Sequence, residues 1–379
     1  MKKNLLICLL CLAMGAVLLG CGSKTEETEA PTTAATEAPT ETETATVPVV
    51  EVPEITTEEE TEPEETEEVL PEGYMRSYLT GEVVPVEVGT LRPVAVQIDN
   101  ERKAQPQNGV AQAEIVYEVP IEAYEVRITA IFQDLSTVGR IGPIRSARVY
   151  HVGIINEFEA FITHVGCSKY AKEYLLNERV GDLDAIRNCW SVIYEADDHI
   201  SGHHDFTTQE RIENAIAKLE YDRNFSEDFT GKFLFAKDDE PTELENGIDA
   251  NTVNTNYKQN HSYFVYDSET QKYLRYAYGS AHVDQDNDEQ VAVDNIIVQY
   301  TTYKHFESTT ENKDIKTVGD GEGWFITHGK AVPITWEKTD FWDDITRYYD
   351  ENGDEIVLNQ GKTWVCIVLP SLTGEITIE

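Results

Sequence analysis

The stretch VRITAIFQDLSTVGRIGPIRSARVYHVGIINEFEAFITHV, residues 126–165, alternates between two kinds of hydrophobic pattern. Residues 126–133 form a short run rich in β-branched side chains, which predicts a strand. Residues 146–158 place apolar side chains at helical spacing, which predicts an amphipathic helix, and residues 160–165 return to a strand pattern. A strand, a helix and a second strand in succession indicate a mixed α/β domain.

Further strand and helix patterns lie on both sides of this stretch. The strand patterns are PVAVQID (93–99) and AEIVYEV (113–119), and the helix patterns are SKYAKEYLLNERV (168–180) and TTQERIENAIAKLEY (207–221). The first of these helices has a serine in the N-cap position. The second begins with Thr207, and Glu210 follows three residues later, which is typical of a capping box. We therefore expect an α/β domain over residues 73–240.

The helical pattern ends near residue 255, and strand patterns follow. They are HSYFVYD (261–267), KYLRYAYG (272–279), VAVDNIIVQYTTYKHF (291–306) and TWVCIVLP (363–370). Residues 323–338 predict a hairpin that turns at Gly329. We expect a smaller, mostly-β domain over residues 255–379, with TWVCIVLP closing its sheet. The predicted fold class is α+β: a mixed α/β domain followed by a β-rich domain.

The N-terminus carries targeting signals. Two lysines precede an apolar run from Leu5 to Leu19, which is the layout of a secretory signal. LLGC (18–21) resembles a bacterial lipobox, which implies a signal peptide over residues 1–20, cleavage before Cys21 and lipid attachment to its sulfur. An uncleaved anchor or an ordinary secretory signal is the alternative. We expect anchoring at the extracytoplasmic face of the bacterial cell membrane.

Residues 21–72 consist almost entirely of Thr, Glu, Pro, Ala and Val, without an aromatic residue. Such a segment cannot bury enough apolar surface to offset its ordering entropy, so we expect a disordered acidic tether. It holds 17 Glu and one Lys, which give it a net charge of −16. The two N-terminal lysines contribute +2, so residues 73–379 carry −26 of the total net charge of −40. This acidic balance argues against nucleic acid as a partner.

Eight segments between residues 92 and 370 carry a family resemblance. They are RPVAVQIDN, AQPQNGVAQAEIVYEV, RITAIFQD, IGPIRSAR, FITHVG, VDNIIVQY, GEGWFITHGKAVPITWEK and NQGKTWVCIVLP. Together they resemble the YerB-like lipoproteins, a two-domain family of unknown function. The resemblance implies an extracytoplasmic lipoprotein and no established reaction.

The same resemblance indicates candidate ligand-binding residues. They are Asp99, Asn100, Glu118, Arg127, Arg145, Arg148, His164 and His204. His204 lies in GHHDFT, where the family commonly has Pro-His-Asn, so Asp205 departs from the pattern. Where the family usually has Glu-Gly-Gly, this chain has Glu122-Ala123-Tyr124. Because both glycines are replaced, a binding role of the exposed glycine backbone is not carried over to this chain.

Arg145 and Arg148 concentrate positive charge in an otherwise acidic chain. If both lie at the start of the predicted helix, their spacing of three places them on one face, where both guanidinium groups can hold one carboxylate or phosphate. The alternative is that they pair internally with carboxylates such as Asp99, Glu114 or Glu118 and serve the architecture.

Other motifs give weaker signals. THVGCS (163–168) resembles the Ser-His-Gly-Cys of cysteine transpeptidases, but it has an extra residue and no arginine, so no catalytic residue is predicted. Cys167 and Cys189 could form one disulfide or remain free thiols. DQDNDEQ (284–290) has calcium-loop spacing without the turn glycine, and adjacent histidines cannot easily share one metal. We expect neither a metal nor another cofactor.

The sequence thus predicts a membrane-anchored lipoprotein that binds an anionic cell-wall or envelope component through an arginine-lined cleft. Its partner would be a cell-wall glycan, a peptide or an envelope protein. One alternative is a hydrolase or transferase that acts on cell-wall material, with Asp99, Glu118 and His164 in acid–base roles. Another is a structural, partner-binding subunit of an envelope complex. An enzymatic role is the less favoured hypothesis.

Overall fold

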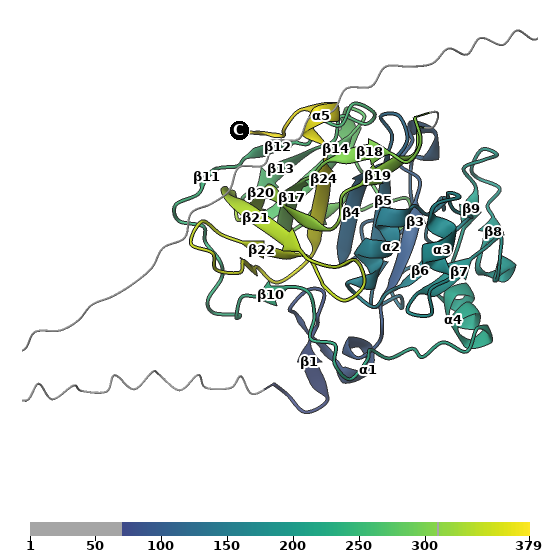
Figure 1. Cartoon of the computed structure of the whole chain (residues 1–379). Coiled ribbons are helices and arrows are strands. Elements are labelled where there is room, and N and C mark those ends of the chain that lie inside the picture. The colour runs from purple at the N-terminus through teal and green to yellow at the C-terminus, as the bar shows by residue number, and fades with distance from the viewer. Residues whose placement is uncertain (1–69, 309–310) are drawn as a thin grey trace, which may run out of the picture. The chain divides into compact units, whose positions relative to one another are not determined.

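The computed structural model describes residues 70–308 and 311–379 of the 379-residue chain. The predicted signal peptide, Cys21 and the tether up to residue 69 lie outside the described residues. Within the described part, eleven strands form one large sheet, and six strands form a smaller second sheet (Figure 1).

The large sheet contains strands from both predicted domains. In spatial order these are β11 (Ile248–Asp249), β21 (Lys330–Lys338), β20 (Gly319–Thr327), β17 (Asn295–Tyr300), β24 (Thr363–Val368), β4 (Ile115–Pro120), β5 (Val126–Phe132), β3 (Val94–Ile98), β6 (Phe161–His164) and β7 (Gly181–Asp184), with β22 (Arg347–Tyr349) paired to β21. The fold is the predicted α+β class, with a mixed α/β region followed by a mostly-β region. The boundaries 73–240 and 255–379 stay predictions, since one sheet runs through both regions.

Strand β24 joins the two regions. It lies between β17 and β4 and runs parallel to both. Trp364 and Cys366 face one core cluster, and Val365 and Ile367 face the other. A strand that is apolar on both faces belongs inside a sheet that is covered on both sides. The prediction that TWVCIVLP closes a separate β sheet is therefore wrong.

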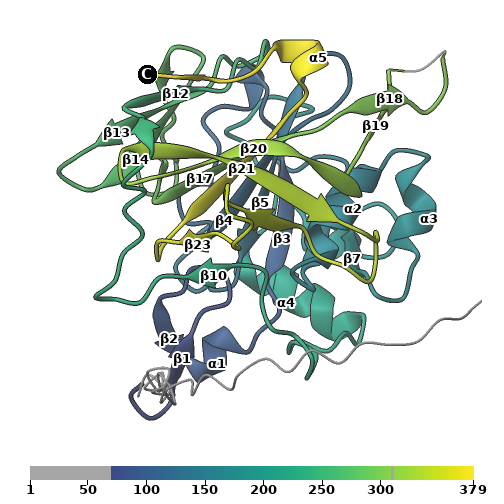
Figure 2. The same cartoon turned by 60° about the vertical axis from the view of Figure 1, so that its left-hand side comes forward.

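Each face of the large sheet is covered by its own layer. Helices α2 (Val149–Asn156) and α3 (Ala171–Leu175) pack on one face. Helix α4 (Gln209–Lys218) and the small sheet pack on the other. The small sheet consists of β12 (Thr252–Asn254), β13 (Tyr263–Asp267), β14 (Lys272–Ala277), β15 (Ser280–Ala281), β16 (Ala292–Val293) and β25 (Thr377–Ile378). Figure 2 shows β12, β13 and β14 at the opposite end of the molecule from α3.

Two local predictions about helix starts need correction. Helix α2 begins at Val149 with Arg148 as its N-cap, so Arg145 lies upstream of the helix and not on its face. Helix α4 has Thr208 as its N-cap, without a side-chain capping bond. The predicted capping box does not form, because the Thr207 hydroxyl donates to the backbone carbonyl of Val192 (2.6 Å). The hairpin of β20 and β21 is confirmed, with its turn at His328-Gly329.

Seven strands of the large sheet run in one direction; one of them is β21, which like β17 is antiparallel to β20, and the other six gather at the centre and at the β7 end of the sheet. Strands β17, β24 and β4 are mutually parallel, as are β3, β6 and β7. Since β4 and β3 are both antiparallel to β5, all six carboxyl ends lie along the same edge. Helix α5 (Pro370–Thr373) and the hairpin of β18 (Tyr303–His305) and β19 (Lys313–Ile315) follow at this edge, whereas β1 (Tyr74–Arg76) and α1 (Val86–Gly89) lie at the other (Figure 1). Ligands of α/β proteins commonly bind outside the carboxyl ends of parallel strands.

The remaining elements are short. They are β2 (Val83–Pro85), the 3-10 turns η1 (Arg102–Ala104) and η2 (Trp190–Val192), β8 (Tyr194–Glu195), β9 (Asp205–Phe206), β10 (Leu234–Phe235) and β23 (Val357–Leu358). Strands β8 and β9 form a small hairpin, and it carries His204 and Asp205 next to each other at the start of β9.

Candidate functional site

The carboxyl edge gathers most of the candidate residues. Asp99 and Asn100 directly follow β3, and His164 ends β6. The segment from Arg145 to Arg148 runs extended beside both strands: the Arg145 amide donates to the Gln97 carbonyl at 2.8 Å, and the Ala147 amide donates to the Gly166 carbonyl at 3.0 Å. The two arginines therefore leave the same stretch of backbone but hold different carboxylates.

Arg145 is fixed on one side and open on the other. Its Nε donates to Asp99 Oδ2 at 2.5 Å, and its Nη2 lies 3.2 Å from His203 Nδ1. His203 Nδ1 also contacts the same Asp99 oxygen at 2.8 Å. Among the described residues, none accepts a hydrogen bond from Arg145 Nη1, and 29% of this side chain is exposed, against 2% for Asp99. One arm of the guanidinium group thus remains available to solvent.

Burial by itself would raise the pKa of the Asp99 carboxyl. The charge of Arg145 and the backbone N–H of Glu101 outweigh burial, so the pKa of Asp99 lies below its usual value. Asp99 is therefore a fixed carboxylate that orients Arg145.

Arg148 is saturated by its own chain. Its Nε and Nη2 both donate to the Glu122 carboxylate at 2.6 Å, a bidentate ion pair. Its Nη1 donates to the Ser146 hydroxyl at 2.8 Å and to the Ala147 carbonyl at 3.1 Å. No nitrogen of Arg148 is left for a ligand, so this residue serves the architecture.

Arg127 lies beneath this pair and is buried. Its Nη1 donates to the Ser146 carbonyl at 2.7 Å, and burial together with the neighbouring Arg148 lowers the pKa of Arg127 to about 10. Arg127 holds the extended arginine segment from below and offers no exposed group.

His164 is buried in a hydrogen-bonded pair with Asp182 and is not an exposed acid–base site. Its Nε2 contacts Asp182 Oδ1 at 2.7 Å and its Nδ1 contacts the Gly166 carbonyl at 2.6 Å, and Asp182 also pairs with Arg187. His164 and Asp182 are 0% and 2% exposed, and burial lowers the pKa of His164. Cys167 follows at this edge, where burial and Asp184 raise the pKa of its thiol, which disfavours a nucleophilic thiolate.

Glu118 and Asn100 belong to a buried polar network. Glu118 Oε1 accepts hydrogen bonds from Arg275 Nη2 (2.8 Å), Asn100 Nδ2 (3.0 Å) and Asn260 Nδ2 (2.7 Å). Both Glu118 and Arg275 are fully buried, and the Arg275 guanidinium lies 4.5 Å from the centroid of the Trp364 ring. The network ties β4 to β14 of the small sheet and has no access for a ligand.

His282 extends this network. Because Arg275 can only donate, its Nη1 fixes His282 Nδ1 as an acceptor at 2.6 Å. His282 Nε2 therefore carries the proton and donates to Gln107 Oε1 at 2.7 Å. Burial and Arg275 hold the pKa of His282 well below its usual value, so the ring is neutral.

His204 lies beside the arginine site, on the small hairpin. Among the described residues, Glu195, His204 and Asp205 offer ligand atoms that all lie within 4.8 Å of one another. The Gly202 amide donates to His204 Nδ1 at 2.9 Å, and burial raises the pKa of Asp205. Three ligand atoms at this spacing could hold a metal ion, so the expectation that the protein binds no metal stays a prediction.

The remaining motifs serve the fold. Asp284 is fully buried and accepts hydrogen bonds from the backbone amides of Ala111 (3.0 Å) and Asp286 (2.9 Å), so it ties two loops together. Cys167, Cys189 and Cys366 are free thiols, and the possible bond between the first two is not formed.

The sequence did not predict Arg275 as the partner of Glu118, nor the pairing of His203 with Asp99. The signal for Arg275 is present: it occupies an inward position in KYLRYAYG, between the buried Tyr273 and Ala277. An arginine at such a position requires a buried carboxylate. His203 has no comparable local signal, because its partner Asp99 lies 104 residues away.

The comparisons with known proteins agree with this fold. Residues 79–222 match the model of the "Protein of unknown function (DUF3048) N-terminal domain", and residues 252–365 match the DUF3048 C-terminal domain. The "Putative lipoprotein YerB" of Bacillus subtilis (strain 168) is 29% identical over 294 residues, which are 78% of this chain and 86% of that protein.

A solved structure extends the agreement to three dimensions. The crystal structure of the YerB protein from Bacillus subtilis is similar with a TM-score of 0.71 and 27% sequence identity, over 80% of this chain and 99% of that chain. In the part of the chain that the structure describes, no helix is long and apolar enough to cross a membrane. The two matched domains and the shared fold confirm the predicted resemblance: this chain belongs to the two-domain DUF3048 family and is homologous to YerB.

Proposed function

We propose that this protein is a membrane-anchored binding protein of the extracytoplasmic face, which recognises an anionic cell-wall or envelope component at the carboxyl edge of its large sheet. The observation that carries the proposal is the half-open guanidinium group of Arg145. Asp99 fixes its Nε, its Nη2 lies beside His203, and Nη1 has no acceptor in the described part of the chain.

Fixing the side chain beforehand favours binding. A free arginine loses rotamer entropy when it binds, whereas Arg145 is already held by a carboxylate at 2.5 Å. Its planar group remains charged at all physiological pH values and suits a carboxylate or phosphate oxygen. Stem-peptide carboxylates and teichoic-acid phosphates both present such oxygens.

The geometry favours binding over catalysis. A hydrolase needs an accessible acid–base pair, and His164 and Asp182 are both buried. Glu118 is fully buried in its pair with Arg275. Because Arg148 already donates its hydrogen bonds to Glu122, only Arg145 of the predicted arginine pair is left to contact a ligand.

Titration calorimetry tests the proposal on the whole chain, purified from membranes in detergent. The probes are a glycerol-phosphate oligomer and a soluble muropeptide that carries a free carboxylate. Loss of a hydrogen bond to a charged group costs about 1.5–3 kcal/mol, so we expect Arg145→Gln to weaken binding at least tenfold. Arg145→Lys keeps the charge and can still reach Asp99, but it lacks the second arm, so it should weaken binding to a similar extent.

Arg179→Gln is the matched control. Arg179 precedes β7 at the opposite edge of the sheet, is 49% exposed, and loses the same single charge. We expect this variant to bind within twofold of the parent. The proposal fails if the Arg145 variants, with an unchanged urea midpoint, bind both probes as tightly as the parent chain.

A further inference from the structure

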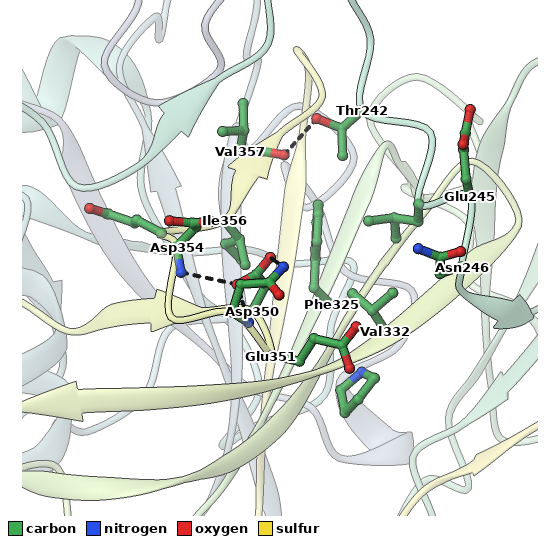
Figure 3. Close-up of a pocket in the computed structure, with 14 residues that line it drawn as sticks. Thr242, Glu245, Asn246, Phe325, Val332, Asp350, Glu351, Asp354, Ile356 and Val357 are labelled. Carbon is green, nitrogen blue, oxygen red and sulfur yellow. Dashed lines mark hydrogen bonds between the residues drawn. The ribbon is translucent and has the colours of Figure 1, made fainter. Parts of the chain in front are cut away.

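A cavity of about 460 Å³ lies at the far end of the large sheet from β7, against strand β21. Figure 3 shows Phe325 and Val332 between Asp354 and Glu245 in this cavity. Neither the arginine site nor the buried Glu118 network contributes to its lining. The cavity is therefore a separate surface of the protein.

The cavity occupies an unpaired stretch of the sheet edge. On its outer side β21 pairs with β11 at Lys330 and Ala331, and with β22 from Thr335 onward. Residues 332–334 lie between these two short partners. Proline at position 333 has no backbone N–H, so an added strand could not form a full ladder there. Recognition at this gap must therefore use side chains.

The lining combines an apolar floor with acidic side chains. Phe325, Val332 and Ile356 contribute apolar surface, and Phe325 and Ile356 are themselves buried. Two of the five lining carboxylates are already engaged: Glu355 pairs with Arg347 at 2.9 Å, and Asp350 accepts hydrogen bonds from its own turn.

The other three carboxylates, those of Glu245, Glu351 and Asp354, are exposed. In residues 70–308 and 311–379, no hydrogen-bond donor and no cationic side chain contacts any of these three carboxylates. A rim of unpaired negative charge above an apolar floor is complementary to a side chain with an apolar stem and a cationic head. Lysine has this structure, since its four-carbon stem packs on apolar surface while its ammonium group reaches polar partners.

A second hollow meets the first at the edge of the sheet and lies on the other face, since Trp324 packs against one core cluster and Phe325 belongs to the other. It measures about 400 Å³, shares Pro333, Asp350 and Glu351 with the first, and adds Trp324 and Glu322. Its aromatic and acidic lining repeats the chemistry of the first hollow, and an aromatic ring also attracts a cation. Two adjoining hollows of one chemistry suit several successive side chains better than one small molecule.

We propose that the groove formed by these two hollows, which crosses the sheet edge at Pro333, binds a lysine-rich, extended segment of a partner polypeptide. The site is distinct from the arginine site and takes a ligand of opposite charge. Charge complementarity supports a cationic partner, because the three free carboxylates place three negative charges beside one apolar surface.

Fluorescence anisotropy with labelled octalysine as the probe tests this proposal on the whole chain in detergent at 0.15 M salt. The test variant carries Glu245→Gln, Glu351→Gln and Asp354→Asn, all at exposed positions where unfolding is not expected. The control carries Glu173→Gln, Glu178→Gln and Glu227→Gln, which are exposed, lie outside both hollows and change the net charge equally. We expect the test variant to bind at least tenfold more weakly than the parent, and the control within twofold.

Three results would overturn the proposal. The first is that the parent does not bind octalysine, and the second is that test and control variants lose affinity equally, which indicates only the overall acidity of the chain. The third is that cadaverine, a single amine on a five-carbon stem, competes as well per molecule as octalysine, which indicates a small-amine site. An octamer of acetylated lysine, which has the stem without the charge, should not compete.

Discussion

The buried pair of Glu118 and Arg275 is the strongest test of how the two halves of the chain are joined. We predict that Arg275→Met destabilises the protein far more than its loss of size implies. The substitution leaves the Glu118 carboxylate fully buried, with only the neutral donors Asn100, Asn260 and Ser262 around it.

The magnitude follows from these contacts. Removal of one partner of a buried ion pair costs about 3–5 kcal/mol, because the remaining charge stays desolvated. The lost contact with the Trp364 ring adds about 1 kcal/mol. With a urea dependence of about 3 kcal/mol per molar, Arg275→Met should lower the midpoint of unfolding by more than about 1 M.

Urea unfolding followed by circular dichroism gives the free energies for a double-mutant cycle with Glu118→Gln. Each single variant leaves one unpaired buried charge, whereas the double variant leaves none, so the double variant should lose less than the sum of the single losses. Arg179→Met, in an ion pair that is 49% and 70% exposed, should change stability by less than about 0.5 kcal/mol. A loss below about 1 kcal/mol for Arg275→Met, or additive losses in the cycle, would refute the reasoning.

Three further predictions concern titratable groups. Burial would raise the pKa of Glu157, but the charges of Lys232 and Lys338 outweigh burial and hold that pKa at about 2, below the ordinary 4.5. The free energy of unfolding should therefore fall by about 3 kcal/mol from pH 5 to pH 2 in urea titrations. In Glu157→Gln the free energy of unfolding should depend less steeply on pH over this range. Burial raises the pKa of Glu114 to about 7, so its contribution to stability should decline as pH rises from about 4.5 to 7, and Glu114→Gln should be more stable than the parent at pH 8 by about 1–3 kcal/mol in urea titrations; equal stability at pH 8 would contradict this. Of the three described cysteines, iodoacetamide should alkylate the half-buried Cys167 in the native protein and the two buried ones only after unfolding, as peptide mass spectrometry can show.

Local patterns accounted for much of the fold. The alternation in residues 126–165 predicts β5, α2 and β6, and the glycine turn predicts the hairpin of β20 and β21. These elements follow from side-chain period and turn chemistry, which act over a few residues. Element ends were less predictable: α2 starts later than its apolar pattern, because Arg148 takes the N-cap position.

The site was predictable in composition and only in part in pairing: Asp99 was among the carboxylates named as possible partners of the arginines, and Glu122 was not. The resemblance drew attention to Arg145 and Arg148 together, and their spacing suggested one shared anion. In the structure Asp99 and Glu122 each hold one of them, because the backbone there is extended and sends the two side chains to different partners.

The sequence by itself determined the acidic balance, the predicted lipid anchor and tether, and the identity of most strands and helices, because composition and period are local properties. Only the tertiary structure decided that β24 lies between β17 and β4, and that Glu118 meets Arg275 across 157 residues. An apolar period shows that a side chain is buried but does not show against which partner. That choice is made by the packing of distant segments, and in this protein it leaves Arg145 partly open while it closes Arg148.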